Sequence, residues 1–215
     1  SAARSGSGAW ARAVDHPRVV ALAVGTRPDW IADEVFGLLR EIARHKPVFL
    51  ELGLQSASER LLRAINRGHG VATFEHAVGR AHQEGLEVVA HVILDLPGET
   101  HGDRLATASC LNHTRVEGVK IHNLHVLRGT ELARWFERGE LRLAPLRQYA
   151  RMAADFLQRL DSGMVIHRLS GEGPATKMLA PPWGRDKRRI LAEVETALGD
   201  CAGWQGKYAV CDHER

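Results

Sequence analysis

The sequence predicts an α/β fold built on a parallel sheet, either doubly wound or curled into a (β/α) barrel. Short apolar, β-branched segments alternate along the chain with longer segments whose apolar residues recur at helical spacing. The 215 residues, 44% of them hydrophobic, suffice for one domain with a core and are too few for two ordinary domains. In both sheet architectures a ligand site is expected at the C-terminal ends of the strands.

The first strand and helix are expected within residues 19–42. Residues 19–25 are short, apolar and β-branched; Pro28 then breaks the strand, and Asp29 can cap a helix. The segment that follows has one apolar stripe at helical spacing, formed by Ile31, Val35, Leu38, Leu39 and Ile42.

The same pattern recurs three times. Further strands are expected at residues 48–54, 88–94 and 118–124, and helices near residues 58–65, 72–84, 101–111 and 131–138. Beyond them we expect an amphipathic helix over residues 149–160, a β-like segment at 164–167 and a final helix over 190–198. Boundary signals support these limits: capping boxes at Ser56 with Glu59 and Thr100 with Asp103, and a left-handed helix end at Gly85.

Polar side chains are expected to converge on one face of the sheet. In residues 48–55 the leucines share one face, so Glu51 and Gln55 must point to the other. His91 lies on the expected strand at residues 88–94, among apolar neighbours. The same alternation puts Lys120 and His122 together on one face of the expected strand at residues 118–124. A single polar residue on a strand usually has a structural role, but several on one side favour a polar or ligand-filled lumen.

Composition narrows the class of protein only modestly. The net charge of +3 neither requires nor excludes a nucleic-acid partner. Three cysteines, Cys110, Cys201 and Cys211, are too far apart for a paired metal motif and odd in number for a disulfide framework, which favours a reducing, cytoplasmic location. No segment approaches the roughly 20 apolar residues of a membrane span, and residues 1–8 lack the apolar centre of a signal peptide.

Three stretches go beyond pattern: GTRPD at residues 25–29, ELGLQS at 51–56 with INRGH at 65–69, and HVILDLPGET at 91–100. In this order and spacing they resemble the radical S-adenosylmethionine (radical SAM) enzymes, in particular the YhcC-like branch related to elongator-type members. The likeness covers residues 19–206. It implies a partial (β/α) barrel with about four of six parallel strands present over residues 19–140. The sequence itself indicates a flexible end at 1–18 and an α-rich extension at 141–215.

The resemblance also implies cofactor contacts. The glutamine after the family's fourth strand and an arginine about twelve residues later contact S-adenosylmethionine, and they correspond to Gln55 and Arg67. The remaining cofactor-binding residues expected on this basis are Ser56, His91, Lys120 and His122. The chain departs from the family at Asp95, where glycine is usual, so Asp95 is expected to crowd or recharge the cofactor pocket.

The chemistry of the family needs a Cys-x3-Cys-x2-Cys loop that holds a four-iron four-sulfur cluster. That motif is absent from this sequence. We therefore expect a fragment or degenerate copy that is inactive alone, and whose first strand forms an exposed, aggregation-prone sheet edge. The parent activity would be reductive cleavage of S-adenosylmethionine to a 5′-deoxyadenosyl radical, acting on a nucleic acid or another macromolecule, with no membrane partner.

Two alternatives remain open at this point. One is a metal-dependent hydrolase on a (β/α) barrel that uses some of the 12 histidines with Glu51 or Asp95 as ligands. His122 and His125 are three residues apart, which on a strand places them on opposite faces and disfavours a shared metal. The other alternative is a non-catalytic module that binds S-adenosylmethionine.

Overall fold

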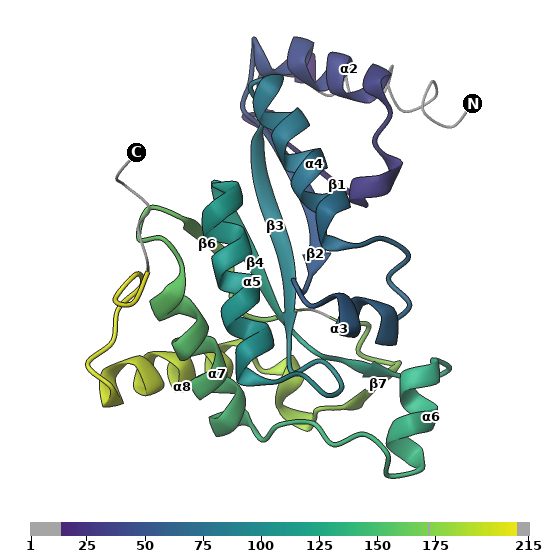
Figure 1. Ribbon diagram of the computed structural model, residues 1–215, viewed down its shortest axis with the longest axis vertical. Coiled ribbons are helices and arrows are strands. Elements are labelled where there is room, and N and C mark those ends of the chain that lie inside the picture. The colour runs from purple at the N-terminus through teal and green to yellow at the C-terminus, as the bar shows by residue number, and fades with distance from the viewer. Residues whose placement is uncertain (1–13, 172, 210–215) are drawn as a thin grey trace.

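The fold is organised around one parallel sheet. The computed structural model describes residues 14–171 and 173–209. Five strands pair in parallel in the order β1-β2-β3-β4-β6, and two short strands form a separate antiparallel pair. The strands are β1 Leu22–Thr26, β2 Val48–Gln55, β3 Glu87–Leu94, β4 Gly118–Asn123 and β6 Val165–Arg168, with β5 Val126–Leu127 and β7 Met178–Ala180 in the pair (Figure 1).

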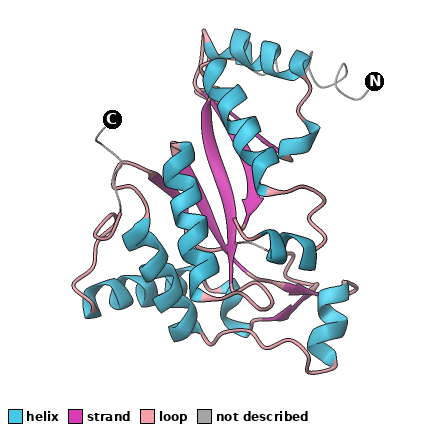
Figure 2. Ribbon diagram, in the orientation of Figure 1, coloured by secondary structure: helices cyan, strands magenta, loops and turns pink. Residues whose placement is uncertain are grey.

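Helices cover one face of this sheet. Figures 1 and 2 show α4 and α5 lying along the strands; α7 lies beside α5, and α8 packs against α7. The α-helices are α2 Asp33–Ala43, α3 Glu59–Ala64, α4 Val71–Gln83, α5 His101–Thr114, α6 Glu131–Glu137, α7 Leu146–Arg159 and α8 Lys187–Asp200, and short 3-10 turns occupy Pro28–Trp30 and Pro182–Arg185.

The main core lies between these helices and the sheet. Leu50, Leu52 and Leu54 on β2 are fully buried, as the alternation of that strand requires, and Phe74 of α4 packs in the same core. Tyr149 and Phe156 bring α7 into it, so the C-terminal helices share one core with the barrel strands. The opposite, lumen-facing side of the strands is left for polar groups.

The predicted fold class is confirmed, with one more strand than the sequence indicated. The sequence predicts residues 164–167 as a β-like segment of the C-terminal extension, whereas β6 pairs in parallel with β4 and continues the barrel sheet. The pair of β5 and β7 was not predicted, because segments of two and three residues are too short to show periodicity.

Two of the three boundary signals act as predicted. The Thr100 hydroxyl accepts a hydrogen bond from the backbone N–H of Asp103, and the Asp103 carboxylate accepts one from the backbone N–H of Thr100, so a capping box begins α5. Gly85 is left-handed, with φ 70°. Ser56, however, is not a helix cap: α3 begins after Ser58, and the Ser56 hydroxyl accepts a hydrogen bond from the Ser58 N–H.

Candidate cofactor cavity and polar lumen

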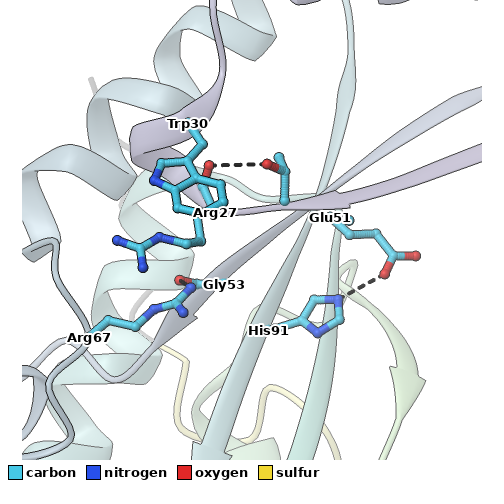
Figure 3. Close-up of a pocket in the computed structure, with 8 residues that line it drawn as sticks. Arg27, Trp30, Glu51, Gly53, Arg67 and His91 are labelled. Carbon is cyan, nitrogen blue, oxygen red and sulfur yellow. Dashed lines mark hydrogen bonds and ion pairs between the residues drawn. The ribbon is translucent and has the colours of Figure 1, made fainter. Parts of the chain in front are cut away.

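A cavity of about 450 Å³ opens on the lumen side of β1, β2 and β3 (Figure 3). Its volume falls within the range of small-molecule and cofactor sites. Its walls are formed by Gly25, Thr26, Arg27, Trp30, Glu51, Gly53, Arg67 and His91. It therefore unites three of the sequence stretches singled out above, which are far apart along the chain.

Arg67 supplies a cation to this cavity. Its Nη2 donates to the carbonyl oxygen of Gly53 at 2.8 Å, whereas its Nε is buried without a hydrogen-bond partner among the described residues. Burial lowers the pKa of Arg67, and the nearby charge of Arg27 adds to that effect. No carboxylate of the described residues pairs with this guanidinium, so it is ready to bind an anion.

Gly53 makes room for two polar side chains. A Cβ at this position would clash with Nη2 of Arg67 and would lie 2.6 Å from Nε2 of Gln55. Both side chains therefore fold over the bare backbone of Gly53. Gln55 itself has φ 71°, and the pairing of β2 with β3 shifts register between Gly53 and Gln55. This irregularity turns the Gln55 amide back over Gly53, and Gln55 itself is not among the residues that line the cavity.

The rim of the cavity is formed by Arg27 and Trp30. Arg27 forms two hydrogen bonds with Asp29, and its guanidinium lies 4.9 Å from the centre of the Trp30 ring. Trp30 is 71% exposed, which is unusual for so large an apolar side chain. The GTRPD stretch thus contributes a neutralised arginine, and Trp30 directly after it contributes an open aromatic surface.

A hydrogen-bonded chain of side chains crosses three strands of the lumen. Lys120 donates to Oε1 of Glu51 at 2.5 Å, Nε2 of His91 lies 2.9 Å from Oε2 of Glu51, and Nε2 of His122 lies 3.2 Å from Nδ1 of His91. The two imidazole rings are nearly parallel, with planes that differ by 21° and centres 5.1 Å apart. The predicted convergence of polar residues on one face is therefore observed.

The carboxylate fixes the proton positions along this chain. An ionised carboxylate only accepts hydrogen bonds, so His91 donates from Nε2 and leaves Nδ1 as an acceptor. His122 must then donate from its own Nε2. Both ring nitrogens of His91 are engaged in this way.

The electrostatics keep the glutamate charged and the histidines neutral. Burial alone would raise the pKa of Glu51, but hydrogen bonds from Lys120 and His91 outweigh it and hold that pKa below its usual value. Burial lowers the pKa of His91 and lowers that of His122 to about 4. The charges of Lys120 and Arg168 act in the same direction on both rings.

Other predicted residues lie away from the cavity. Ser56 is buried 3.5 Å from the Thr107 hydroxyl, among the helices. Asp95 does not line the cavity, contrary to expectation, because its Oδ2 accepts from the backbone N–H of Ala144 at 2.8 Å. Its φ of 70° explains why glycine suits this position.

The two histidines at the end of β4 also differ from the prediction. β4 ends at Asn123, so strand alternation does not extend to His125. A Cβ on Gly171 would lie 3.0 Å from Nδ1 of His122 and 3.4 Å from Cε1 of His125, which places both rings beside the same backbone. Within the described residues, no group of three or more His, Cys, Asp or Glu side chains could hold a metal ion.

The described residues do not fit an iron–sulfur cluster. Cys110 is buried on α5 beside Glu75, and burial raises the pKa of its thiol to about 12. Cys201 is exposed at the end of α8, and neither residue lines the cavity. The part of the chain that the structure describes also has no helix with the length and apolar character of a membrane span.

The fold and cavity define a partial (β/α)-barrel protein with a cavity of cofactor size at its open lumen. Residues 9–111 match the family model of the radical SAM superfamily, and residues 116–199 match that of the radical SAM C-terminal domain. The chain therefore belongs to the radical SAM superfamily, as its motifs indicated.

Similar proteins support this assignment. The chain is 33% identical over 190 residues to YtqA of Bacillus subtilis and 35% identical over 190 residues to YhcC of Escherichia coli, in each case over 88% of this chain. These matches cover 59% and 62% of the two relatives, so the chain spans about three fifths of their length.

A solved structure supports the fold. The archaeal Methanocaldococcus infernus Elp3 with an N-terminal deletion superimposes with a TM-score of 0.75 at 22% identity, over 86% of this chain and 43% of that one. At this level of identity the likeness shows a shared fold.

Proposed function

We propose that the cavity between β1, β2 and β3 binds S-adenosylmethionine, and that the chain is the cofactor-cradling portion of a radical SAM enzyme. The observation that carries this proposal is Arg67, a guanidinium inside the cavity with a buried Nε that lacks a partner among the described residues. Such a group suits the methionyl carboxylate, which accepts two parallel N–H bonds from arginine.

The remaining polar groups suit the rest of the cofactor. The amide of Gln55 can donate to and accept from ribose hydroxyls, and it lies over Gly53 beside Arg67. Glu51, which was not among the predicted cofactor residues, lines the cavity and has lone pairs left after binding Lys120 and His91. It is better placed than His91 to accept from a hydroxyl, because both nitrogens of His91 are occupied.

We propose the family's reductive cleavage of S-adenosylmethionine only for longer proteins that carry the cluster loop. In a longer protein with that loop, a four-iron four-sulfur cluster would supply the electron for cleavage of S-adenosylmethionine. This sequence lacks the Cys-x3-Cys-x2-Cys motif, and Cys110 and Cys201 do not approach the cavity. We therefore assign cofactor binding to the chain, with a nucleic acid or another macromolecule as the proposed substrate of the parent reaction.

Calorimetric titration with S-adenosylmethionine tests the proposal. The chain should bind it saturably, and Arg67→Met should weaken binding by about tenfold or more, the value of one lost charge-assisted pair. Arg63→Met is the matched control, because Arg63 is exposed on the adjacent α3 and outside the cavity. Undetectable binding at millimolar cofactor, or equal affinity for Arg67→Met, would contradict the proposal.

A further inference from the structure

We propose that Arg168 and His122 form a second binding site, beside the cofactor cavity, for an anionic oxygen group of the substrate. This inference rests on the proposed function, since it gives the lumen a substrate next to the cofactor. The two residues lie on β6 and β4, outside the set that lines the cavity.

Arg168 is a cation of the lumen without a partner among the residues that the structure describes. It lies opposite Lys120 in the pairing of β4 with β6 and is half-buried. Lys120 is paired with Glu51, whereas Arg168 forms no hydrogen bond or ion pair within the described ranges. A half-buried arginine loses hydration without compensation unless an anion binds it.

The charges around Arg168 favour such an anion. Lys120 and Arg168 contribute two positive charges and Glu51 contributes one negative charge, so these three groups leave one positive charge unbalanced. His91 and His122 add none, because the pKa of each ring is lowered. Arg168 contributes to that lowering on both rings, and it pairs with Lys120 in the sheet, so its charge lies near the lumen histidines.

His122 adds directionality to the site. Because its Nε2 donates to His91, its Nδ1 is an unprotonated acceptor. A side chain at position 171 would approach this atom within 3.0 Å, so glycine there keeps Nδ1 accessible. A ligand that pairs an anionic oxygen with a neighbouring hydroxyl would satisfy Arg168 and His122 together.

The site would hold the substrate next to the cofactor. His91 lines the cavity and lies within hydrogen-bond distance of His122, so the proposed anion site adjoins the cavity wall. Phosphate and carboxylate share the chemistry that Arg168 recognises, and the geometry of a guanidinium suits both.

Nuclear magnetic resonance of ring-labelled histidines in the 215-residue chain tests the site. Inorganic phosphate is titrated in one arm and acetate in the other, with the His122 signals identified by their loss in His122→Gln. We expect saturable shifts of the His122 ring signals in at least one arm, and the stronger arm identifies phosphate or carboxylate. Arg168→Met should weaken this binding by about tenfold, and Arg168→Lys should weaken it less.

Arg188→Met is the control, because Arg188 is exposed on α8 and should leave the titration unchanged. Binding of S-adenosylmethionine to Arg168→Met is measured in parallel. It should equal that of the unaltered chain, which checks folding and separates this site from the cofactor cavity. His122 signals unmoved by millimolar phosphate and acetate, or shifts that persist in Arg168→Met, would overturn the proposal even if the cofactor binds.

Discussion

Glu51 on β2 and Lys120 on β4 meet across the intervening strand β3, with Oε1 and Nζ 2.5 Å apart. Their side chains are only 14% and 18% exposed, so this ion pair is largely shielded from water. Removing one partner from such a pair leaves an uncompensated charge, which costs more than the pair itself contributes.

A double-mutant cycle on this pair should therefore show strong coupling. We expect Glu51→Gln and Lys120→Met each to lower the free energy of unfolding by about 2 to 4 kcal/mol, and the double variant to lose less than the sum. Denaturant unfolding measures all four proteins. The exposed pair of Glu131 and Arg134 is the control, and its coupling should be at most about 0.5 kcal/mol. Equal coupling in the two cycles would disprove the shielded character of the lumen pair.

Gly53 should be essential to the cavity. In Gly53→Ala the new methyl group collides with Arg67 and with Nε2 of Gln55, so the arginine must leave its position over the β2 backbone. We expect affinity for S-adenosylmethionine to fall by about tenfold or more, as for loss of the arginine itself. Calorimetry provides the measurement.

Gly37→Ala is the matched control, since Gly37 lies within α2 and a Cβ there meets nothing within 4 Å. It should preserve the affinity and raise stability by up to about 1 kcal/mol, the difference in helix propensity between glycine and alanine. If the two alanine variants bound the cofactor equally, Gly53 would have no special role.

The fold could be predicted because its signals are local. Each long strand is an apolar run that ends at a turn residue, and Thr100 with Asp103 marks the start of α5 in four residues of sequence. β6 was missed as a barrel strand because its four residues follow a long helical region, and only pairing with β4 distinguishes it from a loop.

The cavity could be predicted only in part. Alternation on β2 placed Glu51 toward the lumen, but not its bonds to Lys120 and His91, which depend on the register of three strands. Arg27 and Trp30 were missed, since a GTRPD stretch followed by tryptophan reads locally as a turn into a helix. Their position beside Arg67 arises from the loop after α3, where Gly68 adopts φ 81°.

His122 should make the chain sensitive to acid. Its pKa is about 4 in the folded chain, mainly because of burial, against 6.5 for an unburied histidine, as in the unfolded chain. The unfolded chain therefore takes up a proton on His122 before the folded chain does, and stability is lost as the pH falls from 6.5 to 4. A pKa shift of this size lowers the free energy of unfolding by about 3 kcal/mol once His122 is protonated in both states.

The variant His122→Gln keeps a donor for His91 and cannot titrate. Its stability should fall less steeply than that of the unaltered chain between pH 6.5 and 4, by up to about 3 kcal/mol over the interval. Denaturant midpoints at several pH values measure the difference. His45→Gln, at an exposed position, serves as the control. Parallel curves for His122→Gln and the unaltered chain would refute a buried neutral ring.

Glu99 should affect the pH dependence of stability in the opposite sense to His122. This carboxyl group is 3% exposed, accepts a hydrogen bond from the backbone N–H of Asp95 at 2.9 Å and lies 3.2 Å from Arg104. Burial outweighs these contacts and raises its pKa from 4.5 to about 7. The folded chain therefore holds this proton more tightly than the unfolded chain does. The stability that protonated Glu99 gives the fold is fully present below pH 4.5 and is lost as the pH rises to about 7.

Glu99→Gln preserves the acceptor for Asp95 and removes the titration. The variant should match the unaltered chain near pH 4.5 and exceed its stability by up to about 3 kcal/mol at pH 8, where Glu99 must be charged. Glu137→Gln, on the exposed side of α6, should leave the pH profile unchanged. A Glu99→Gln variant that is less stable at pH 8 would show instead that the ion pair with Arg104 outweighs burial and holds the turn into α5.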